Sequence, residues 1–122
     1  GITPEMVRDA PRLSELKPQI LEMIGDQIVT IYNAEFDTAF LQRTGITITN
    51  AYCAMTGFAK YRGVWNKKYR EYKWCSLDMA CEVMGIDRTA RHRALADTQD
   101  TRRLLQAIAT REPEVIPFEM YH

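Results

Sequence analysis

The sequence predicts a single α/β domain in which helices dominate and the sheet is incomplete. Residues 27–32 form a β-branched run without helical spacing, which is typical of a strand covered on both faces. Helical spacing returns on both sides of this run. Only two short stretches favour strand among five or six helical segments, although a buried strand needs sheet neighbours. Either the sheet is completed by something outside this sequence, or one strand assignment is wrong.

Two short helices open the predicted order of elements. Thr3 and Pro4 are typical of an N-cap and a first helical position, and Pro11 ends the helix that they begin. Ser14 is expected to cap a second helix, which stops at Gly25. The apolar residues of this second helix share one face: Leu13, Leu16, Ile20, Met23 and Ile24.

The middle of the chain contains both predicted strands. Asn33 ends the strand at residues 27–32, and a helix follows as far as Gly45. Residues 46–49 alternate isoleucine and threonine, which predicts a short second strand. Residues 51–61 are predicted to be helical and lead into an irregular stretch around Gly63.

The last third is predicted to be helical, followed by an extended tail. Ser76 is expected to cap a helix that ends before Gly85, since apolar residues recur there at helical spacing. Another helix is predicted over residues 94–110. Two prolines in residues 111–122 favour an extended C-terminal end.

Composition excludes some classes of function. The 122 residues suffice for one domain with a modest core. Lysine plus arginine equals aspartate plus glutamate at 16 each, so a charged partner has to be met by a local patch. No apolar run approaches the roughly 20 residues that a membrane span needs. With no signal peptide either, the chain is expected to be soluble and cytoplasmic.

The cysteines and the first residue support the same interpretation. Cys53, Cys75 and Cys81 form no CxxC pair and have no neighbouring histidine, which argues against a disulfide framework and a zinc site. They are expected to be buried thiols in a reducing compartment. Because the chain begins with Gly1 instead of methionine, an upstream segment is expected to have been cleaved, left out or lost.

The first candidate site follows the predicted strand at residues 27–32. Asp37 lies in the first turn of the helix that leaves the carboxyl end of this strand, where ligands bind in open α/β sheets. The alternative is that Asp37 only complements the helix dipole. Phe36 and Phe40 do not discriminate, because phenylalanines at this spacing are common in cores.

The second candidate site lies at the start of the last predicted helix. Asp97 interrupts a face that is otherwise small or apolar: Ala94, Thr98, Thr101, Leu104, Leu105 and Ile108. A carboxylate there needs a partner, because burying an unpaired charge costs several kcal/mol. A metal ion is one such partner. His92, on the approach to the helix, could then deprotonate a water, although a surface histidine is the alternative.

These two sites together favour phosphodiester hydrolysis. Two-metal hydrolysis needs several carboxylates that hold ions roughly 4 Å apart, together with a base. Asp37, Asp97 and His92 are part of that set.

Residues 58–74 combine cations with aromatic rings. The cations are Lys60, Arg62, Lys67, Lys68, Arg70 and Lys73, against the single acid Glu71. The rings are those of Phe58, Tyr61, Trp65, Tyr69, Tyr72 and Trp74. This mixture suits single-stranded nucleic acid, because cations follow phosphates and rings stack on bases. The alternative is that the rings are core and the cations form a solvated rim.

The two sites carry a family resemblance. Residues 29–37, VTIYNAEFD, resemble the second motif of the DEDDh (DnaQ-like, proofreading-type) exonucleases, usually written HNAxFD. Residues 92–97, HRALAD, resemble their third motif, HxAxxD. The opening residues 1–7 are similar to the linker before the second motif. The resemblance covers nearly the whole chain, with both motifs in the right order and at about the right separation.

The resemblance implies a fold, an activity and roles for residues. The fold is ribonuclease-H-like, with residues 1–112 as a partial exonuclease domain and 113–122 as a tail. The implied reaction is two-metal hydrolysis, with Mg²⁺ or Mn²⁺, at the 3′ end of single-stranded DNA or RNA. Asp37 and Asp97 would bind metal, and His92 would activate water. The side chains implied to support the site or the terminal nucleotide are Asn33, Phe36 and Phe40.

The sequence departs from the family pattern in two places. Tyr32 stands where the family often has histidine. The first motif, a DxE on the family's first strand, is absent, because the chain starts after its position. The remaining N-terminal acids lie on predicted helices or a turn: Glu5, Asp9, Glu15, Glu22 and Asp26. The family's first three strands would lie in the absent segment, which accounts for the incomplete sheet.

Two functions follow as expectations. One is an exonuclease domain that is weak or inactive as this fragment, because two of four metal-binding carboxylates are missing. The other is a non-catalytic module that binds nucleic acid or protein. A DxE strand encoded upstream of Gly1 would discriminate between them. The unpaired edge of the strand at residues 27–32 also predicts a homodimer.

Overall fold

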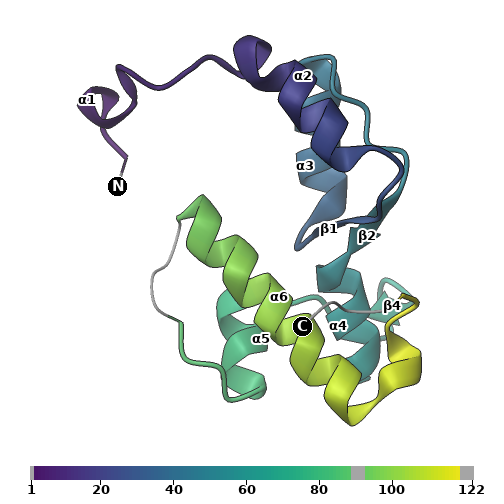
Figure 1. Ribbon diagram of the computed structural model, residues 1–122. Helices are drawn as coiled ribbons and strands as arrows, with labels where there is room; N and C mark the ends of the chain where they lie inside the picture. The colour runs from purple at the N-terminus through teal and green to yellow at the C-terminus, as the bar shows by residue number, and fades with distance from the viewer. Residues whose placement is uncertain (1, 89–92, 119–122) are drawn as a thin grey trace.

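The computed structural model describes residues 2–88 and 93–118 and has a mixed α/β fold in which helices dominate (Figure 1). In chain order the elements are α1 (Pro4–Val7), α2 (Leu13–Ile24), β1 (Val29–Ile31), α3 (Ala34–Arg43), β2 (Ala51–Cys53), α4 (Ala54–Arg62), β3 (Trp65–Asn66), β4 (Glu71–Tyr72), α5 (Leu77–Val83), α6 (Ala94–Arg111) and the 3₁₀ helix η1 (Pro113–Val115). Helices α2 and α3 lie around β1 and β2, and α4, α5 and α6 gather on the other side of these strands (Figure 1).

A two-stranded parallel sheet connects the two halves of the chain. β1 pairs with β2 in a register that sets Val29 opposite Ala51, and α3 forms the crossover between the strands. The Val29 N–H donates to the Asn50 carbonyl. Because successive peptide groups of a strand alternate in direction, those of Thr30 point away from β2. Within the described residues β1 pairs only with β2, so this side of β1 is an open edge.

The second strand was predicted in the wrong place. Residues 46–49 are a loop, and the strand is formed by Ala51–Cys53, where a helix had been expected. Ile46 is fully buried, and its N–H donates to the Leu41 carbonyl at the end of α3. The alternation of isoleucine and threonine therefore belongs to a loop in which Ile46 is buried, and not to a strand. The first strand is also shorter than predicted, at Val29–Ile31 instead of residues 27–32.

The core lies where α4, α5 and α6 pack together. Its buried residues are Ala54, Phe58, Leu77, Ala80, Cys81, Met84, Leu104, Leu105, Ile108 and Ile116. The prediction that Ser76 caps a helix is confirmed, since its hydroxyl accepts a hydrogen bond of 3.1 Å from the Met79 N–H. This cap fixes the start of α5, and so the position of its apolar face in the core.

The two ends of the described chain differ from the predictions. Ser14 does not cap α2, because the helix begins at Leu13 with Arg12 as its N-cap residue, and the Glu15 carboxylate accepts from the Arg12 N–H. The expected extended tail begins with the helical turn η1 (Pro113–Val115), and Ile116 is buried in the core. The division of the chain at residue 112 remains a prediction. No helix in residues 2–88 and 93–118 is long and apolar enough to cross a membrane.

Candidate functional site

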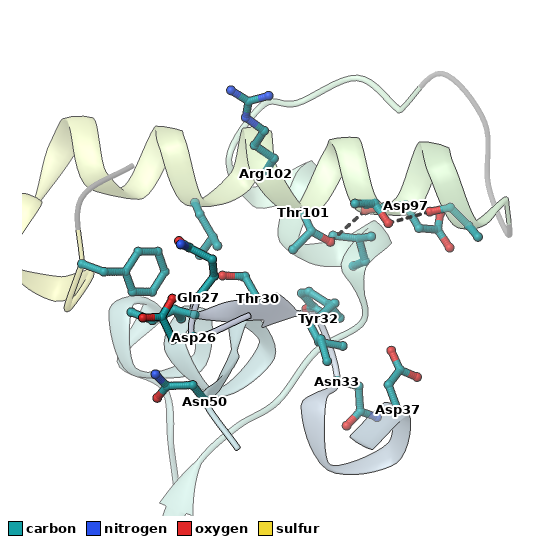
Figure 2. Close-up of a pocket in the computed structure, with 17 residues that line it drawn as sticks. Asp26, Gln27, Thr30, Tyr32, Asn33, Asp37, Asn50, Asp97, Thr101 and Arg102 are labelled. Carbon is teal, nitrogen blue, oxygen red and sulfur yellow. Dashed lines mark hydrogen bonds between the residues drawn. The ribbon is translucent and has the colours of Figure 1, made fainter. Parts of the chain in front are cut away.

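A cleft of about 1200 Å³ lies along the open edge of β1 (Figure 2). Residues of β1 and α6 line its two sides, and Thr30 lies at the strand edge that borders it. Asn33 and Asp37 line the part of the cleft that follows the carboxyl end of β1, which is where ligands bind in open α/β folds. The polar side chains that line the cleft are those of Asp26, Gln27, Thr30, Tyr32, Asn33, Asp37, Asn50, Asp97, Thr98, Thr101 and Arg102.

The structure brings Asp37 and Asp97 to this one cleft, although they are sixty residues apart in sequence. Asp37 lies in the first turn of α3, directly after β1, and its side chain is exposed. Figure 2 shows it pointing from α3 toward the side of the cleft formed by α6. Asn33, the N-cap residue of α3, lines the cleft beside it. Three of the predicted site residues therefore share one cleft, and their roles remain predictions.

Asp97 has an ionic partner within the chain. Its carboxylate accepts a hydrogen bond from the guanidinium of Arg88. The same guanidinium donates to Asp78 of α5 and, at 3.1 Å, to Asp100 of α6. The Arg88 side chain is only 7% exposed. The charge on Asp97, for which a metal ion had been one candidate partner, is thus neutralised by arginine here.

Burial and charge act in opposite directions on Arg88. Burial, the largest single effect, lowers the pKa of Arg88 because it disfavours the charged form. Hydrogen bonds to Asp100 and Asp78 and the charge of Asp97 outweigh it and raise the pKa above the usual value. Arg88 is therefore a permanent cation among three carboxylates.

Asp100 is a member of this cluster that the sequence interpretation missed. It is 1% exposed and also pairs with Arg103 at 3.1 Å. Its position at four- and eight-residue spacing from Leu104 and Ile108 was a usable signal, because this spacing places it on the buried face of α6. Arg88 gave no comparable signal, since it lies in a loop and meets the helix only through the fold.

Tyr32 ties the end of β1 to the segment before α5. Its hydroxyl donates a hydrogen bond of 2.6 Å to the Cys75 carbonyl. Burial, with a smaller contribution from Cys75, raises the pKa of Tyr32 far above its usual value. The residue that stands in the family's histidine position is therefore a neutral phenol that lines the cleft.

Other predicted site residues lie away from the cleft or outside the described residues. Phe36 and Phe40 are 69% and 57% exposed, so they are not core residues, and neither lines the cleft. His92 lies outside the described residues. Its role as a base remains a prediction.

The cleft supplies only part of what a divalent ion needs. Aspartate oxygens suit Mg²⁺ and Mn²⁺, so Asp37 and Asp97 have the right chemistry. Among residues 2–88 and 93–118, however, no three His, Cys, Asp or Glu side chains come together as metal ligands. Arg88 also engages Asp97. These residues alone do not make a complete metal site.

The cationic and aromatic stretch, residues 58–74, divides between core and surface. Phe58 is fully buried in the core, as the structural alternative predicted, and Tyr61 is half-buried. The rings of Trp65, Tyr69 and Trp74 are exposed, on or next to the antiparallel hairpin of β3 and β4. The cations singled out from the sequence lie in the turn of this hairpin and are exposed: Lys67, Lys68 and Arg70.

The chain matches an exonuclease family model and is similar to a bacterial polymerase and a phage exonuclease. A family model described as Exonuclease (RNase T) matches residues 1–105. The chain is 32% identical over 105 residues to the DNA polymerase III PolC-type protein of Bacillus subtilis, covering 86% of this chain and 7% of the polymerase. It is 30% identical over 122 residues to the uncharacterized exonuclease CP81 of Escherichia phage 186, covering 89% of this chain and 62% of the phage protein. The chain thus spans less than two-thirds of either relative. No solved structure matched significantly.

Proposed function

The chain belongs to the exonuclease family whose model it matches, and on that basis we propose that it works as a 3′–5′ exonuclease domain on nucleic acid. Exonucleases of this family generally depend on divalent metal ions. The observation that carries the proposal is the meeting of Asp37 and Asp97 in one cleft, from two separate helices. Each of these aspartates belongs to a motif that resembles one of the family's own.

The two aspartates of the cleft and His92 are given separate tasks in this proposal. Asp37 and Asp97 bind the metal, and His92 takes a proton from the attacking water. Bound divalent ions, here Mg²⁺ or Mn²⁺, would activate that water and stabilise the leaving oxygen. The neutral hydroxyl of Tyr32 cannot add a negative charge to the site.

The terminal nucleotide is proposed to rest against the start of α3. Asn33 lines the cleft and offers an amide for hydrogen bonds. Phe36 and Phe40 present exposed rings on the same helix. Exposed rings suit stacking against a nucleobase, and the helix that carries both of them also carries Asp37, which lines the cleft.

The remaining carboxylates are proposed to come from an acidic strand that lies in the cleft. The peptide groups of Thr30 point toward this space, so an extended segment can pair with β1 there. A DxE on that segment would bring two carboxylates close to Asp37 and Asp97. Without them, two carboxylates cannot offset the repulsion between two divalent ions, so the 122-residue chain alone is proposed to be weak or inactive.

A non-catalytic binding module is the second candidate function. The ion pair between Arg88 and Asp97 favours this second function, because a carboxylate neutralised by an arginine is not free to bind metal. In the exonuclease proposal, the added carboxylates and the ions have to draw Asp97 away from Arg88. The two candidates therefore differ in whether the complete cleft hydrolyses nucleic acid.

Complementation of the cleft separates these candidates. The chain is assayed in Mg²⁺ and in Mn²⁺ on a 5′-labelled single strand, alone and with an acidic DxE strand fused before Gly1. The fused strand should produce fragments that shorten from the 3′ end. A matched strand with Asn-x-Gln should not. Binding without hydrolysis by the fused chain would favour the non-catalytic module.

We further propose a cellular setting and a partner for the chain alone. Its three cysteines, Cys53, Cys75 and Cys81, are free thiols, which suits the reducing cytoplasm. When no other strand covers the edge of β1, a second copy of the chain is proposed to pair with it and form a homodimer.

A further inference from the structure

The hairpin formed by β3 and β4 presents aromatic rings to solvent instead of burying them. Tyr69 is 62% exposed, Trp74 53% and Trp65 50%. Large exposed aromatic groups on one short hairpin are typical of a contact surface, because a core role would have buried them. None of them lines the cleft beside β1.

Local hydrogen bonds hold this hairpin in a defined shape. The Asn66 side chain accepts from the Lys68 N–H at 3.0 Å, which fixes the turn. The Lys73 N–H donates to the Val64 carbonyl at 2.7 Å and extends the pairing of β3 with β4. Rings on a fixed hairpin lose less conformational entropy when a ligand binds.

A hollow of about 550 Å³ is lined by residues of the hairpin. Tyr69, Tyr72 and Trp74 contribute its rings. Asn66, Glu71 and Lys73 contribute its polar groups. Its size is within the range of about 300–1,000 Å³ that small-molecule sites have. Ring faces with a few hydrogen-bonding groups suit a flat heteroaromatic ligand such as a nucleobase.

The positive charge around the hollow indicates that a nucleobase bound there would belong to a ligand with phosphate groups. The turn and its flanks carry Lys67, Lys68, Arg70 and Lys73 against the single acid Glu71. The whole chain, by contrast, has equal numbers of acidic and basic residues. The Lys68 ammonium lies 5.1 Å from the centre of the Tyr69 ring, so cations and rings are within reach of neighbouring parts of one ligand. A phosphate backbone is the complementary partner.

We infer that this hairpin is a second contact region for single-stranded nucleic acid, in which unpaired bases stack on Tyr69 and Trp74 while the turn cations hold phosphates. A duplex fits less well, because its base faces are already stacked. The inference rests on the proposed function only for the choice of nucleic acid as ligand. It goes beyond that function because the hollow and the cleft share no lining residue.

Binding of a fluorescent 20-mer of single-stranded DNA, measured by anisotropy without divalent metal, tests this inference separately from hydrolysis. Tyr69→Leu and Trp74→Leu should each weaken binding about 5- to 150-fold, the loss expected for one stacked base. Tyr69→Phe and Trp74→Phe retain a ring and should bind within about threefold of the original chain. Thermal unfolding of each variant should match that of the original chain, since these rings are exposed.

The cations are tested through salt dependence. Replacing Lys67, Lys68 and Arg70 by alanine should reduce the slope of log affinity against log salt by about 0.7 for each phosphate that the variant no longer neutralises. A control variant replaces two exposed cations outside the hairpin, Arg8 and Arg12, and should leave the slope unchanged.

Several outcomes would overturn the inference. They are an absence of binding, equal affinity for the matched duplex, and leucine variants that bind as tightly as the original chain. Leucine variants that lose self-association in sedimentation, while DNA binding stays the same, would make the hollow a protein interface. Failure of the complemented chain to digest DNA would refute the proposed hydrolysis and leave this binding result standing.

Discussion

Arg88 donates a hydrogen bond to the carboxylate of Asp97, so the aspartate of the third motif is an anchor of the fold as well as a candidate metal ligand. The contact joins the loop after α5 to the first turn of α6. Asp78 and Asp100 complete the cluster around the same guanidinium. The position of Asp97 at the cleft is therefore coupled to the packing of α5 against α6.

Removing the Arg88 guanidinium should destabilise the fold. Arg88→Met leaves Asp100, whose side chain is 2% exposed, without its buried partner, and breaking such a pair costs about 3–5 kcal/mol. Arg103→Met is the matched control, because its partner is the same aspartate but its own side chain is 47% exposed. We expect the control to cost less than about 1 kcal/mol. Urea unfolding measures the free energy of unfolding of the two variants. Equal losses of stability in Arg88→Met and Arg103→Met would contradict the role given to Arg88.

Stability should fall in alkaline solution because of Tyr32. Burial raises the pKa of Tyr32 in the folded chain above the usual 10.0, so the unfolded chain loses this proton first. The stability that the protonated Tyr32 hydroxyl contributes to the folded chain is therefore fully present below about pH 10. It is lost as the pH rises further. Tyr32→Phe should flatten this decline, and Tyr69→Phe, at an exposed ring, should not. Urea midpoints between about pH 8 and 11 give the comparison. If the urea midpoints of Tyr32→Phe and of the original chain fell equally with rising pH, Tyr32 would not be the cause of the decline.

Gly57 leaves room for the Tyr52 hydroxyl beside α4. A Cβ at this glycine would lie 2.1 Å from that oxygen. Gly57→Ala should consequently cost about 1–3 kcal/mol by overpacking, although alanine is the better helix former. Adding Tyr52→Phe should recover part of the loss, because it removes the nearest atom. Thermal unfolding of the single and double variants measures the coupling, and a stabilised Gly57→Ala would show that the ring moves freely.

The open edge of β1 should make the isolated chain self-associate. Thr30 lies at the centre of this edge, and Thr30→Lys should shift the population toward monomer by placing a charge there. Thr47→Lys, in the exposed loop after α3, is the control and should leave association unchanged. Sedimentation at high micromolar concentration gives the populations. A stable monomer of the original chain, with slow amide exchange in β1, would mean that the edge is covered from within.

The sequence predicted those parts of the fold that depend on local chemistry. The cap at Ser76 and the strand that leads to Asp37 follow from nearby residues, and both are present. The assignment of residues 46–49 as a strand failed because burial of Ile46 in a loop produces the same alternation. Local pattern cannot separate the two, since the difference depends on what packs against the isoleucine.

The sequence allowed the motif residues of the candidate site to be predicted, but not their tertiary contacts. Asp37 and Asp97 were identified from their positions relative to a strand and a helix, and they do share a cleft. The pairing of Asp97 with Arg88 was not predicted, because it joins a loop to a helix through tertiary packing. The exposure of Trp74 and Tyr69 likewise depends on how the hairpin lies against the core, which ring spacing does not determine.

We propose above all that Asp37 and Asp97 form part of one hydrolytic site. The most direct measurement follows a 5′-labelled single strand in Mg²⁺ or Mn²⁺ with the chain that carries the fused DxE strand. We expect stepwise shortening from the 3′ end, reduced at least about 10²-fold by Asp37→Asn and by Asp97→Asn, because each removes a carboxylate from the metal site. Digestion that proceeds unchanged in both variants would contradict the claim.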